Sequence, residues 1–375
     1  MCFEKFDEKF MKIALELAKK GKGKVSPNPF VGCVIVKNNK IISKGFHQFF
    51  GGPHAEISAL KNLPENLDKK TLSKATLYIN LEPCCHYNKK TPPCVPEIIK
   101  SGIKKLVIAM KDPNPEVNGK GIKELQDAGI KCRVGILKNQ AEELNKFYIK
   151  WITKKLPYVI MKWAMSIDGK IATKTGNSKW ISSTESRKYV YELRSEMDAV
   201  LVGIKTILKD NPYLTSHGHG KNPIRVIIDP HLKISKNANV FSKDAKTIII
   251  CSERNKEKSE RILEEISKDN ENVEFLYFEL DRGGKINFKE IFQTLGKRNI
   301  SSLLIEGGGT TNSLALKSGC IDEILVFLSP KIVGGEKAIT PVEGSGIEKI
   351  SSAIVFRYKE CKRLGNDYLL RLERQ

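Results

Sequence analysis

Two segments that lie far apart in the chain carry side chains suited to a soft metal ion, and their pairing restricts the fold more than any other feature. The segment GGPHAEISAL places His54 and Glu56 at the expected start of a helix. The segment EPCCHYNKKTPPC places Cys84 after an expected strand and Cys94 before an expected helix. One histidine and two cysteines can hold zinc and leave the fourth position of a tetrahedral site to water. The fold must therefore bring together the start of one helix, the end of a strand and the start of a second helix.

The same segments supply the groups of a hydrolytic deaminase. Zinc lowers the pKa of a bound water toward about 7, so hydroxide is available at neutral pH. Glu56 lies beside the ligands and can take the proton of that water and deliver it to the departing ammonia. The order H-x-E, P-C, C is typical of nucleobase deaminases. A purely structural zinc site is the alternative, and it would need a fourth protein ligand, for which Cys85 or His86 is available in sequence.

Cysteine usage and the N-terminal sequence indicate a reducing compartment. The chain has nine cysteines, and only Cys84, Cys85 and Cys94 cluster. An odd number without a signal peptide argues against a disulfide framework. The N-terminal segment MCFEKFDEKFMKIALELAKK is amphipathic and lacks the apolar core of a signal peptide. No apolar run approaches the roughly 20 residues of a membrane span. We therefore expect a cytoplasmic protein without membrane contact.

The formal net charge of +21 raises the question of nucleic-acid binding. The basic excess is spread over both halves, and it consists of 52 lysines and only 12 arginines. Specific contacts to phosphates and bases favour arginine. We therefore expect a lysine-rich surface that attracts a phosphorylated small substrate, and no nucleic-acid partner.

The first half alternates amphipathic helices with apolar strands. Helical spacing of apolar residues and short apolar runs bounded by turn residues mark the two kinds of element. We expect helices over 4–20, 54–62, 95–101, 119–128 and 138–150, and strands over 30–36, 40–45, 76–81, 105–110 and 131–135. Such an order predicts a three-layer α/β/α domain with helices on both faces of one sheet.

The second half has its own alternating pattern, which begins near Pro157. We expect strands over 159–165, 199–203, 224–229, 247–251, 274–278, 302–306 and 323–329, two further strands within 352–373, and helices over 185–195, 253–268, 288–295 and 311–318. This predicts a second α/β domain with a largely parallel sheet. We place the boundary within 147–155, which gives domains over 1–149 and 150–375.

Three segments of the second half carry chemistry: KWAMSIDGKIAT with GNSKWISS, VGIKTILKDNPYLT, and LLIEGGGTTNSLAL. In the last, a buried strand ends at Glu306, three glycines follow, and a helix begins. Glycines permit close backbone approach, and free N–H groups at a helix start bind phosphate. The segment therefore predicts a phosphate or dinucleotide site, with a simple tight turn as the alternative.

The first half resembles the zinc-dependent cytidine and nucleobase deaminase superfamily through HAE, EPC, TPPC and NPFVGCVIV. Within it, the long loop between Cys84 and Cys94 resembles the deaminase half of the bifunctional riboflavin-biosynthesis deaminase–reductases. The loop has nine residues here and eight in the family pattern, so either Lys89 or Lys90 matches the family's substrate-contacting lysine; we assign Lys90. The resemblance implies that Asn28, His47 and His86 also contact substrate. On the residues alone, Asn28 could equally be a turn residue between two prolines.

From Pro157 onward the chain resembles the reductase half of the same family, which has a dihydrofolate-reductase-like fold and uses NADPH. The resemblance implies an NADPH site lined by Ala164, Trp180, Thr206, Asp210, Gly308, Gly309, Thr310 and Thr311. It implies that substrate is faced by Lys162, Ser178, Arg194, Leu214 and Glu306, with Lys162 and Glu306 catalytic. Without the resemblance, Trp180 could be a core residue and Asp210 a turn cap.

One departure from the family pattern concerns the substrate phosphate. The family offers an arginine after the equivalent of Leu214-Thr215, whereas this chain reads Thr215-Ser216-His217. His217 is therefore expected to replace that arginine, with a grip that depends on pH. Lys205 or Lys221 could compensate for the lost charge.

Together these patterns predict a bifunctional enzyme of riboflavin biosynthesis that acts with one zinc ion per chain and NADPH. The first domain would hydrolytically deaminate 2,5-diamino-6-ribosylamino-4(3H)-pyrimidinone 5′-phosphate, and the second would reduce the ribosyl group of the product to ribityl. We expect a homo-oligomer, either a dimer or a tetramer. The alternatives are a nucleic-acid or nucleoside deaminase with an appended nucleotide-binding domain, and a zinc-stabilised binding module without enzymatic activity.

Overall fold

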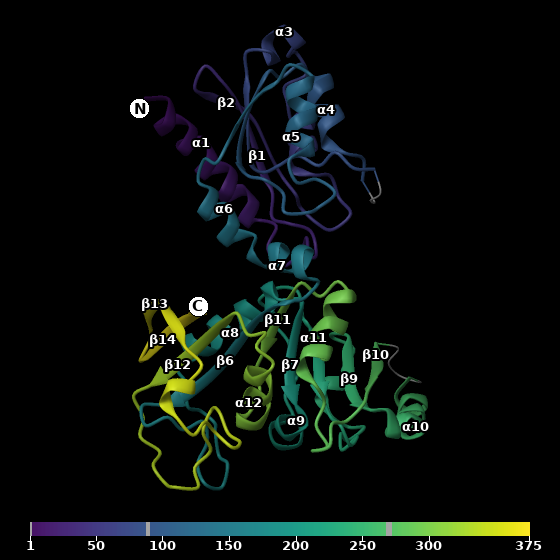
Figure 1. Cartoon of the computed structure of the whole chain (residues 1–375), viewed down its shortest axis with the longest axis vertical. Coiled ribbons are helices and arrows are strands. Elements are labelled where there is room, and N and C mark those ends of the chain that lie inside the picture. Colours follow the sequence, from purple (N-terminus) through teal and green to yellow (C-terminus); the bar gives the residue numbers. More distant parts are fainter. Residues whose placement is uncertain (1, 88–90, 268–271) are drawn as a thin grey trace. The chain divides into compact units, whose positions relative to one another are not determined.

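The computed structural model describes residues 2–87, 91–267 and 272–375. Internal contacts divide the chain into two compact units, Met1–Leu156 and Pro157–Gln375. Each unit has its own sheet, and Figure 1 shows the elements of each. Among the described residues, no helix has the length and apolarity needed to cross a membrane.

The first unit follows the predicted alternation of helices and strands. Its helices are α1 (Cys2–Lys19), α2 (Ala55–Lys61), α3 (Lys69–Leu72), α4 (Cys94–Ser101), α5 (Lys120–Asp127), α6 (Lys138–Leu144) and α7 (Lys146–Lys154). Its strands are β1 (Gly32–Lys37), β2 (Lys40–Phe46), β3 (Thr76–Leu81), β4 (Lys105–Met110) and β5 (Lys131–Val134). The predicted elements are thus confirmed, apart from the helix predicted over 138–150, which is divided in two, and the short helix α3 is an addition.

One sheet in the order β2-β1-β3-β4-β5 forms the middle layer of this unit. Strand β1 pairs antiparallel with both β2 and β3, whereas β3, β4 and β5 are parallel. Helices α1 and α6 contact each other and the sheet, and α2, α4 and α5 form a second contacting group. The two groups cover opposite faces of the sheet (Figure 1). The predicted three-layer arrangement is therefore confirmed.

The helix predicted over 138–150 is divided into α6 and α7 at Asn145. The Asn145 side chain accepts a hydrogen bond from the Phe30 N–H at 2.7 Å and donates one to the Phe30 carbonyl at 3.1 Å. Asparagine side chains that bond backbone groups compete with helical geometry. The helix breaks because this amide bonds a distant loop, which helical periodicity cannot reveal.

The second unit contains β6 (Tyr158–Ser166), β7 (Ala199–Gly203), β8 (Ile224–Ile228), β9 (Thr247–Ser252), β10 (Val273–Phe278), β11 (Ser302–Ile305), β12 (Glu323–Ser329), β13 (Phe356–Leu364) and β14 (Asp367–Arg374). Its helices are α8 (Thr184–Glu196), α9 (Ile204–Asp210), α10 (Lys256–Ser267), α11 (Phe288–Lys297) and α12 (Gly309–Lys317). Short 3-10 helices span Asn239–Phe241, Glu253–Asn255 and Ile350–Ser352.

The described strands of the second unit form one sheet in the order β10-β9-β8-β7-β11-β6-β12-β14-β13. All neighbours from β10 to β12 are parallel, and the C-terminal hairpin β13–β14 adds an antiparallel edge. The predicted largely parallel sheet is confirmed. In open parallel sheets, ligands bind beyond the carboxyl ends of the strands. The carboxyl ends of β6, β7 and β11 are therefore where a site is expected.

Helix α9 was not predicted as an element, although its residues were singled out for their chemistry. It begins directly after the buried strand β7, with Gly203 at its N-cap and no side-chain cap. Helix starts are recognised in sequence mainly by a capping Ser, Thr, Asp or Asn. A seven-residue helix without that signal is hard to separate from the strand before it.

Candidate active sites

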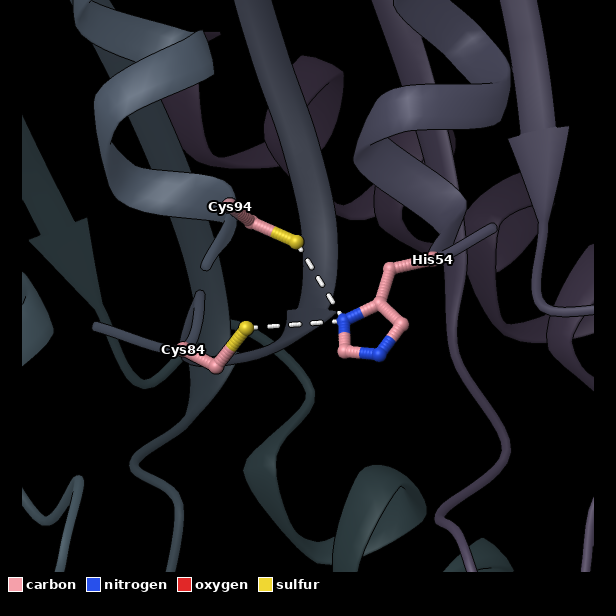
Figure 2. Close-up of side chains that lie close together, drawn as sticks. All are labelled: His54, Cys84 and Cys94. Carbon is pink, nitrogen blue, oxygen red and sulfur yellow. Dashed lines mark hydrogen bonds between the residues drawn. The ribbon is translucent and has the colours of Figure 1, made fainter. Parts of the chain in front are cut away.

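Three metal-binding side chains converge in the first unit from three different elements. His54 is the N-cap of α2, Cys84 follows β3, and Cys94 is the first residue of α4. Their ligand atoms all lie within 4.8 Å of one another, and Figure 2 shows both sulfurs directed at the same imidazole nitrogen. Cys84 and Cys94 are buried and His54 is partly buried. The sheet order explains why these residues lie close together. Strand β2 leads into α2 and β3 leads to Cys84, and only β1 separates the two strands in the sheet.

The donor set and its spacing fit zinc. His54 Nδ1 lies 3.4 Å from Cys84 Sγ and 3.3 Å from Cys94 Sγ. With usual zinc–sulfur and zinc–nitrogen bond lengths, a tetrahedral site separates sulfur from nitrogen by about 3.5 Å. The other ring nitrogen, Nε2, lies 3.0 Å from Thr91 Oγ1. If Nδ1 binds the metal, Nε2 carries the proton and donates it to Thr91, and partners of this kind orient metal-binding histidines.

The two residues considered for a fourth ligand face elsewhere. Cys85 Sγ is directed at the Glu116 carbonyl, 4.0 Å away, and His86 Nε2 lies 3.6 Å from the Glu116 carboxylate. Among the described residues, the cluster of potential ligands contains only the histidine and two cysteines already named. This arrangement suits a site that keeps a position open rather than a closed structural site. Lys90, expected to contact substrate, lies outside the described residues.

Glu56 follows His54 by two residues in α2 and is only 3% exposed. Burial raises the pKa of its carboxyl group, and the negative charge of Cys84 raises it further. The fully buried thiol of Cys33 is a neighbour, and its own pKa is raised by burial and by Glu56. A carboxyl group whose pKa is shifted upward can both accept and return a proton near neutral pH.

Asn28 and His47, both predicted to contact substrate, form one hydrogen-bonded unit beside the metal ligand. His47 Nδ1 lies 3.0 Å from the Pro53 carbonyl, and Asn28 Nδ2 lies 3.0 Å from His47 Nε2. The carbonyl requires a proton on Nδ1, so Nε2 accepts from the amide. Burial lowers the pKa of His47, which favours this neutral form. The His47 ring stands edge-on to His54 with centroids 5.3 Å apart.

Two residues of this site were not singled out from the sequence. Thr91 belongs to the TPPC segment, but only its fold places it behind His54. Glu82 belongs to the EPC segment and is 2% exposed, with its carboxylate surrounded by backbone N–H groups. In the sequence, the only signal that these two residues belong to the site was that each lies shortly before one of the motif cysteines.

The second unit brings Lys162, Arg194 and Glu306 together beyond the sheet. Lys162 lies on β6, Arg194 in the last turn of α8, and Glu306 directly after β11. Lys162 Nζ is 3.3 Å from Glu306 Oε2, and Arg194 donates to both carboxylate oxygens, at 2.6 and 3.1 Å. The register explains the pairing, since Ile305 is opposite Met161 and the next residues face each other.

Charge dominates this cluster. Burial alone would raise the pKa of Glu306, but the positive charges of Arg194 and Lys162 outweigh it and lower the pKa to about 2. Arg194 is 8% exposed and also donates to the Thr215 carbonyl at 3.0 Å. The Glu306 side chain is therefore a carboxylate at any physiological pH.

The loop after Leu214 lies against this cluster. Leu214 is buried, and the His217 ring packs against the Tyr191 ring at a tilt of 42°, with centroids 4.2 Å apart. The Arg194 guanidinium lies 5.8 Å from the same Tyr191 ring. Burial lowers the pKa of His217, and the charges of Arg194 and His219 lower it further. His217, which is expected to replace an arginine, thus lies close to the cluster, and its lowered pKa favours the neutral form of the ring.

The glycine-rich turn leads into α12, as predicted. Gly308 is the N-cap of α12, and a Cβ built on it would meet open space. Free helix N–H groups suit a phosphate, whereas a Cβ built on the next residue, Gly309, would collide with the Glu343 side chain. The buried Asn312 Oδ1 has no hydrogen-bond partner, and as an acceptor it suits a hydroxyl or amide N–H of a cofactor. These features fit a dinucleotide. The Glu343 carboxylate also lies here, since Thr310 Oγ1 donates to it at 3.2 Å.

The remaining residues expected at the NADPH site lie on α9, on β6 or on the loop after β6. A side chain on Gly203 would collide with Thr311, so the start of α9, with Thr206, adjoins the start of α12. Asp210 is the last residue of α9. Ala164 follows Lys162 by two residues on β6, so both face one side.

Ser178 and Trp180 lie on the loop between β6 and α8. Trp180 is 61% exposed, with the Arg187 guanidinium 4.4 Å above its ring. The alternative interpretation of Trp180 as a core residue is therefore wrong. The Trp180 carbonyl accepts a hydrogen bond from Lys331 Nζ, which connects this loop to the one after β12.

Comparison with known proteins places both units. Residues 4–110 match the family described as the cytidine and deoxycytidylate deaminase zinc-binding region, and residues 157–370 match the RibD C-terminal domain. The chain is 41% identical to the riboflavin biosynthesis protein RibD of Aquifex aeolicus, over 98% of each chain. It is 34% identical to RibD of Escherichia coli, over 98% of this chain and 99% of the other.

Two solved structures have the same fold over nearly the whole chain. A diaminohydroxyphosphoribosylaminopyrimidine deaminase/5-amino-6-(5-phosphoribosylamino)uracil reductase from Thermotoga maritima has a TM-score of 0.85 and 37% identity, with all of both chains covered. RibD of Acinetobacter baumannii has a TM-score of 0.87 and 33% identity, with 99% of both covered.

Proposed function

The chain belongs to the RibD family of bifunctional riboflavin-biosynthesis enzymes, and on that premise we propose how its own residues divide the deaminase and reductase reactions. The deaminase belongs to residues 1–149 and the reductase to residues 150–375. The substrate of the first reaction is 2,5-diamino-6-ribosylamino-4(3H)-pyrimidinone 5′-phosphate, and the second reduces the ribosyl group of the deaminated product to ribityl. The convergence of His54 Nδ1 with two thiols supports the first assignment above all.

In the deaminase site, His54, Cys84 and Cys94 would hold the zinc ion. Zinc supplies the Lewis acid that makes water a nucleophile at neutral pH. Glu56 takes one proton from the attacking water and passes it to the exocyclic nitrogen, so that the C–N bond breaks and ammonia leaves. The second water proton goes to the adjacent ring nitrogen as the carbonyl forms. The upward-shifted pKa of Glu56 suits both of its transfers. The Asn28–His47 unit, fixed by the Pro53 carbonyl, orients the pyrimidine, and His86 and Lys90 contact the remainder of the substrate.

In the reductase site, NADPH supplies a hydride for C1′ of the ring-opened ribosylamine, whose C=N bond becomes C–N–H. Lys162 provides the proton that the nitrogen gains, because Glu306 stays ionised. Glu306 accepts hydrogen bonds from substrate hydroxyls and orients Lys162 at 3.3 Å. Arg194 and His217 face the 5′-phosphate, and Ser178 and Leu214 line the substrate.

The NADPH contacts are assigned to the start of α12 and its neighbours. The first turn of α12, with Gly308, Gly309, Thr310 and Thr311, receives a phosphate of the cofactor. Thr206 and Asp210 of α9, Ala164 of β6 and the exposed ring of Trp180 line the rest. We further propose a homo-oligomer, either a dimer or a tetramer, that works in the cytoplasm without a nucleic-acid partner.

Paired assays on the full-length enzyme test these assignments. Ammonia release and NADPH oxidation are measured with the pyrimidine phosphate, and NADPH oxidation also with separately supplied deaminated product. Glu56→Gln should abolish ammonia release only, and Arg194→Ala should impair reduction only. The exposed Glu65→Gln serves as the matched control and should retain both activities. Normal ammonia release by Glu56→Gln would remove the general-base assignment, and deamination of a nucleoside or single-stranded nucleic acid at a comparable rate would favour the alternative function.

A further inference from the structure

A buried carboxylate lies two residues before the metal-site cysteine Cys84. Glu82 is 2% exposed and follows β3 directly. Its Oε2 accepts hydrogen bonds from the backbone N–H groups of Asp112 at 3.1 Å and Gly119 at 2.9 Å. Its Oε1 accepts a third from Ile122, in the first turn of α5, at 3.1 Å. One side chain thus joins the end of β3 to the loop after β4 and to the start of α5.

These bonds hold the backbone that leads into Cys84. The Glu82 N–H donates to the Met110 carbonyl at 3.0 Å, which ties the same residue to the end of β4. The Cys84 carbonyl accepts hydrogen bonds from the N–H groups of Cys94 at 3.0 Å and Val95 at 3.3 Å. Cys84 therefore lies between two fixed points, the Glu82 network on one side and the first turn of α4 on the other.

A close backbone contact with α5 also restrains Pro83, the residue between Glu82 and Cys84. A Cβ built on Gly121 would collide with the Pro83 carbonyl oxygen and would lie 3.4 Å from Glu82 Oε1. Helix α5 can approach this closely only because residue 121 is glycine. The Pro83 carbonyl is one residue from Cys84, so any shift there moves the ligand.

We propose that Glu82 is a positioning residue for the metal centre, acting through the backbone of Cys84, and that Gly121 supports it by allowing α5 to pack on Pro83. Three converging N–H donors require an acceptor-only group, which a carboxylate is and an amide is not. A Glu82→Gln side chain would turn an NH₂ group toward at least one N–H donor and lose that bond. This inference rests on the proposed function, since it assumes that Cys84 binds the metal.

The test uses full-length enzyme in which cobalt(II) replaces zinc, because the visible and thiolate-to-cobalt absorption bands report the ligand geometry directly. Glu82→Gln and Gly121→Ala should each alter the cobalt spectrum and speed the release of zinc to a chelator by about 10–100-fold, as expected for lost outer contacts of a metal site. Gly121→Ala retains the carboxylate, so it tests the position of Cys84 even if Glu82→Gln does not fold. Reductase activity of the same samples should be unchanged.

Glu65→Gln is the matched control and should keep the wild-type spectrum and release rate. The inference is overturned if both variants show the wild-type cobalt spectrum and release rate, including the case in which they merely unfold at lower denaturant concentration. If the wild-type enzyme itself shows no thiolate-to-cobalt band, the proposed metal site fails and this inference fails with it. If the wild-type enzyme shows the band and the two variants do not differ from it, only this inference fails and the proposed function stands.

Discussion

Glu306 illustrates how a single residue's charge state is decided by its neighbours. Two cations surround its buried carboxylate and lower its pKa from the ordinary 4.5 to about 2. A carboxyl group with a lowered folded-state pKa stabilises the fold above its unfolded pKa, and this contribution is lost as pH falls through the folded value. The shift corresponds to about 3 kcal/mol of unfolding free energy.

We therefore predict that the second unit loses stability between about pH 5 and pH 2, and that Glu306→Gln weakens this dependence. The variant leaves Arg194 buried without its carboxylate, so it should also be less stable at pH 7. Urea unfolding at a series of pH values measures both effects. Arg194→Ala is the companion variant, because it removes the main cause of the shift. A wild-type pH slope retained by Glu306→Gln would contradict the assignment.

Thr91 permits a sharper test of the metal centre at the same scale. Its hydroxyl lies 3.0 Å from His54 Nε2. With the metal on Nδ1, Nε2 donates to this hydroxyl, and the bond fixes the ring so that Nδ1 faces the sulfurs. Thr91→Val has almost the same shape but no hydroxyl, and we predict a loss of zinc affinity of about 10-fold or more. Thr91→Ser keeps the hydroxyl and should bind zinc nearly normally. Chelator competition on the purified enzyme measures the affinities, and equal affinities of the two variants would exclude this role.

At the scale of elements, the start of α12 holds a negative charge where we propose that a phosphate binds. The Glu343 carboxylate interacts with Thr310 in the first turn of the helix. Two negative groups compete for one helix start, and such interactions contribute about 0.3–1 kcal/mol each. We predict that Glu343→Gln lowers the KM for NADPH by about two- to five-fold. Steady-state kinetics measure it, with the exposed Glu336→Gln as control; an increased KM would place the phosphate elsewhere.

The elements that carry the sites were predictable, while their ends were less so. The strands before Cys84 and Glu306 are apolar runs bounded by turn residues, so their type and position followed from the sequence. Helix α9 was missed because it has no capping side chain, and the break at Asn145 arises from a bond to a loop more than a hundred residues earlier. Local patterns contain neither piece of information.

At the scale of the whole molecule, two units with separate sheets carry the two proposed reactions. We predict that defects in one unit leave the other active. A mixture of Glu56→Gln enzyme and Glu306→Gln enzyme should therefore convert the pyrimidine phosphate to the ribityl product, because each supplies the step that the other lacks. Product formation is followed by chromatography. Absence of product, despite normal activity of each variant on its own half-reaction, would mean that the intermediate does not leave the enzyme.

The sequence alone determined the chemistry of the metal site and the class of both domains, because ligand type, motif spacing and apolar periodicity are properties of the chain itself. It indicated His54, Cys84 and Cys94 before any fold was known. Only the tertiary structure decided which imidazole nitrogen faces the sulfurs, that Arg194 and Lys162 keep Glu306 ionised, and that Glu82 anchors the backbone before Cys84. These are consequences of distance and burial between residues far apart in sequence, and no local pattern encodes them.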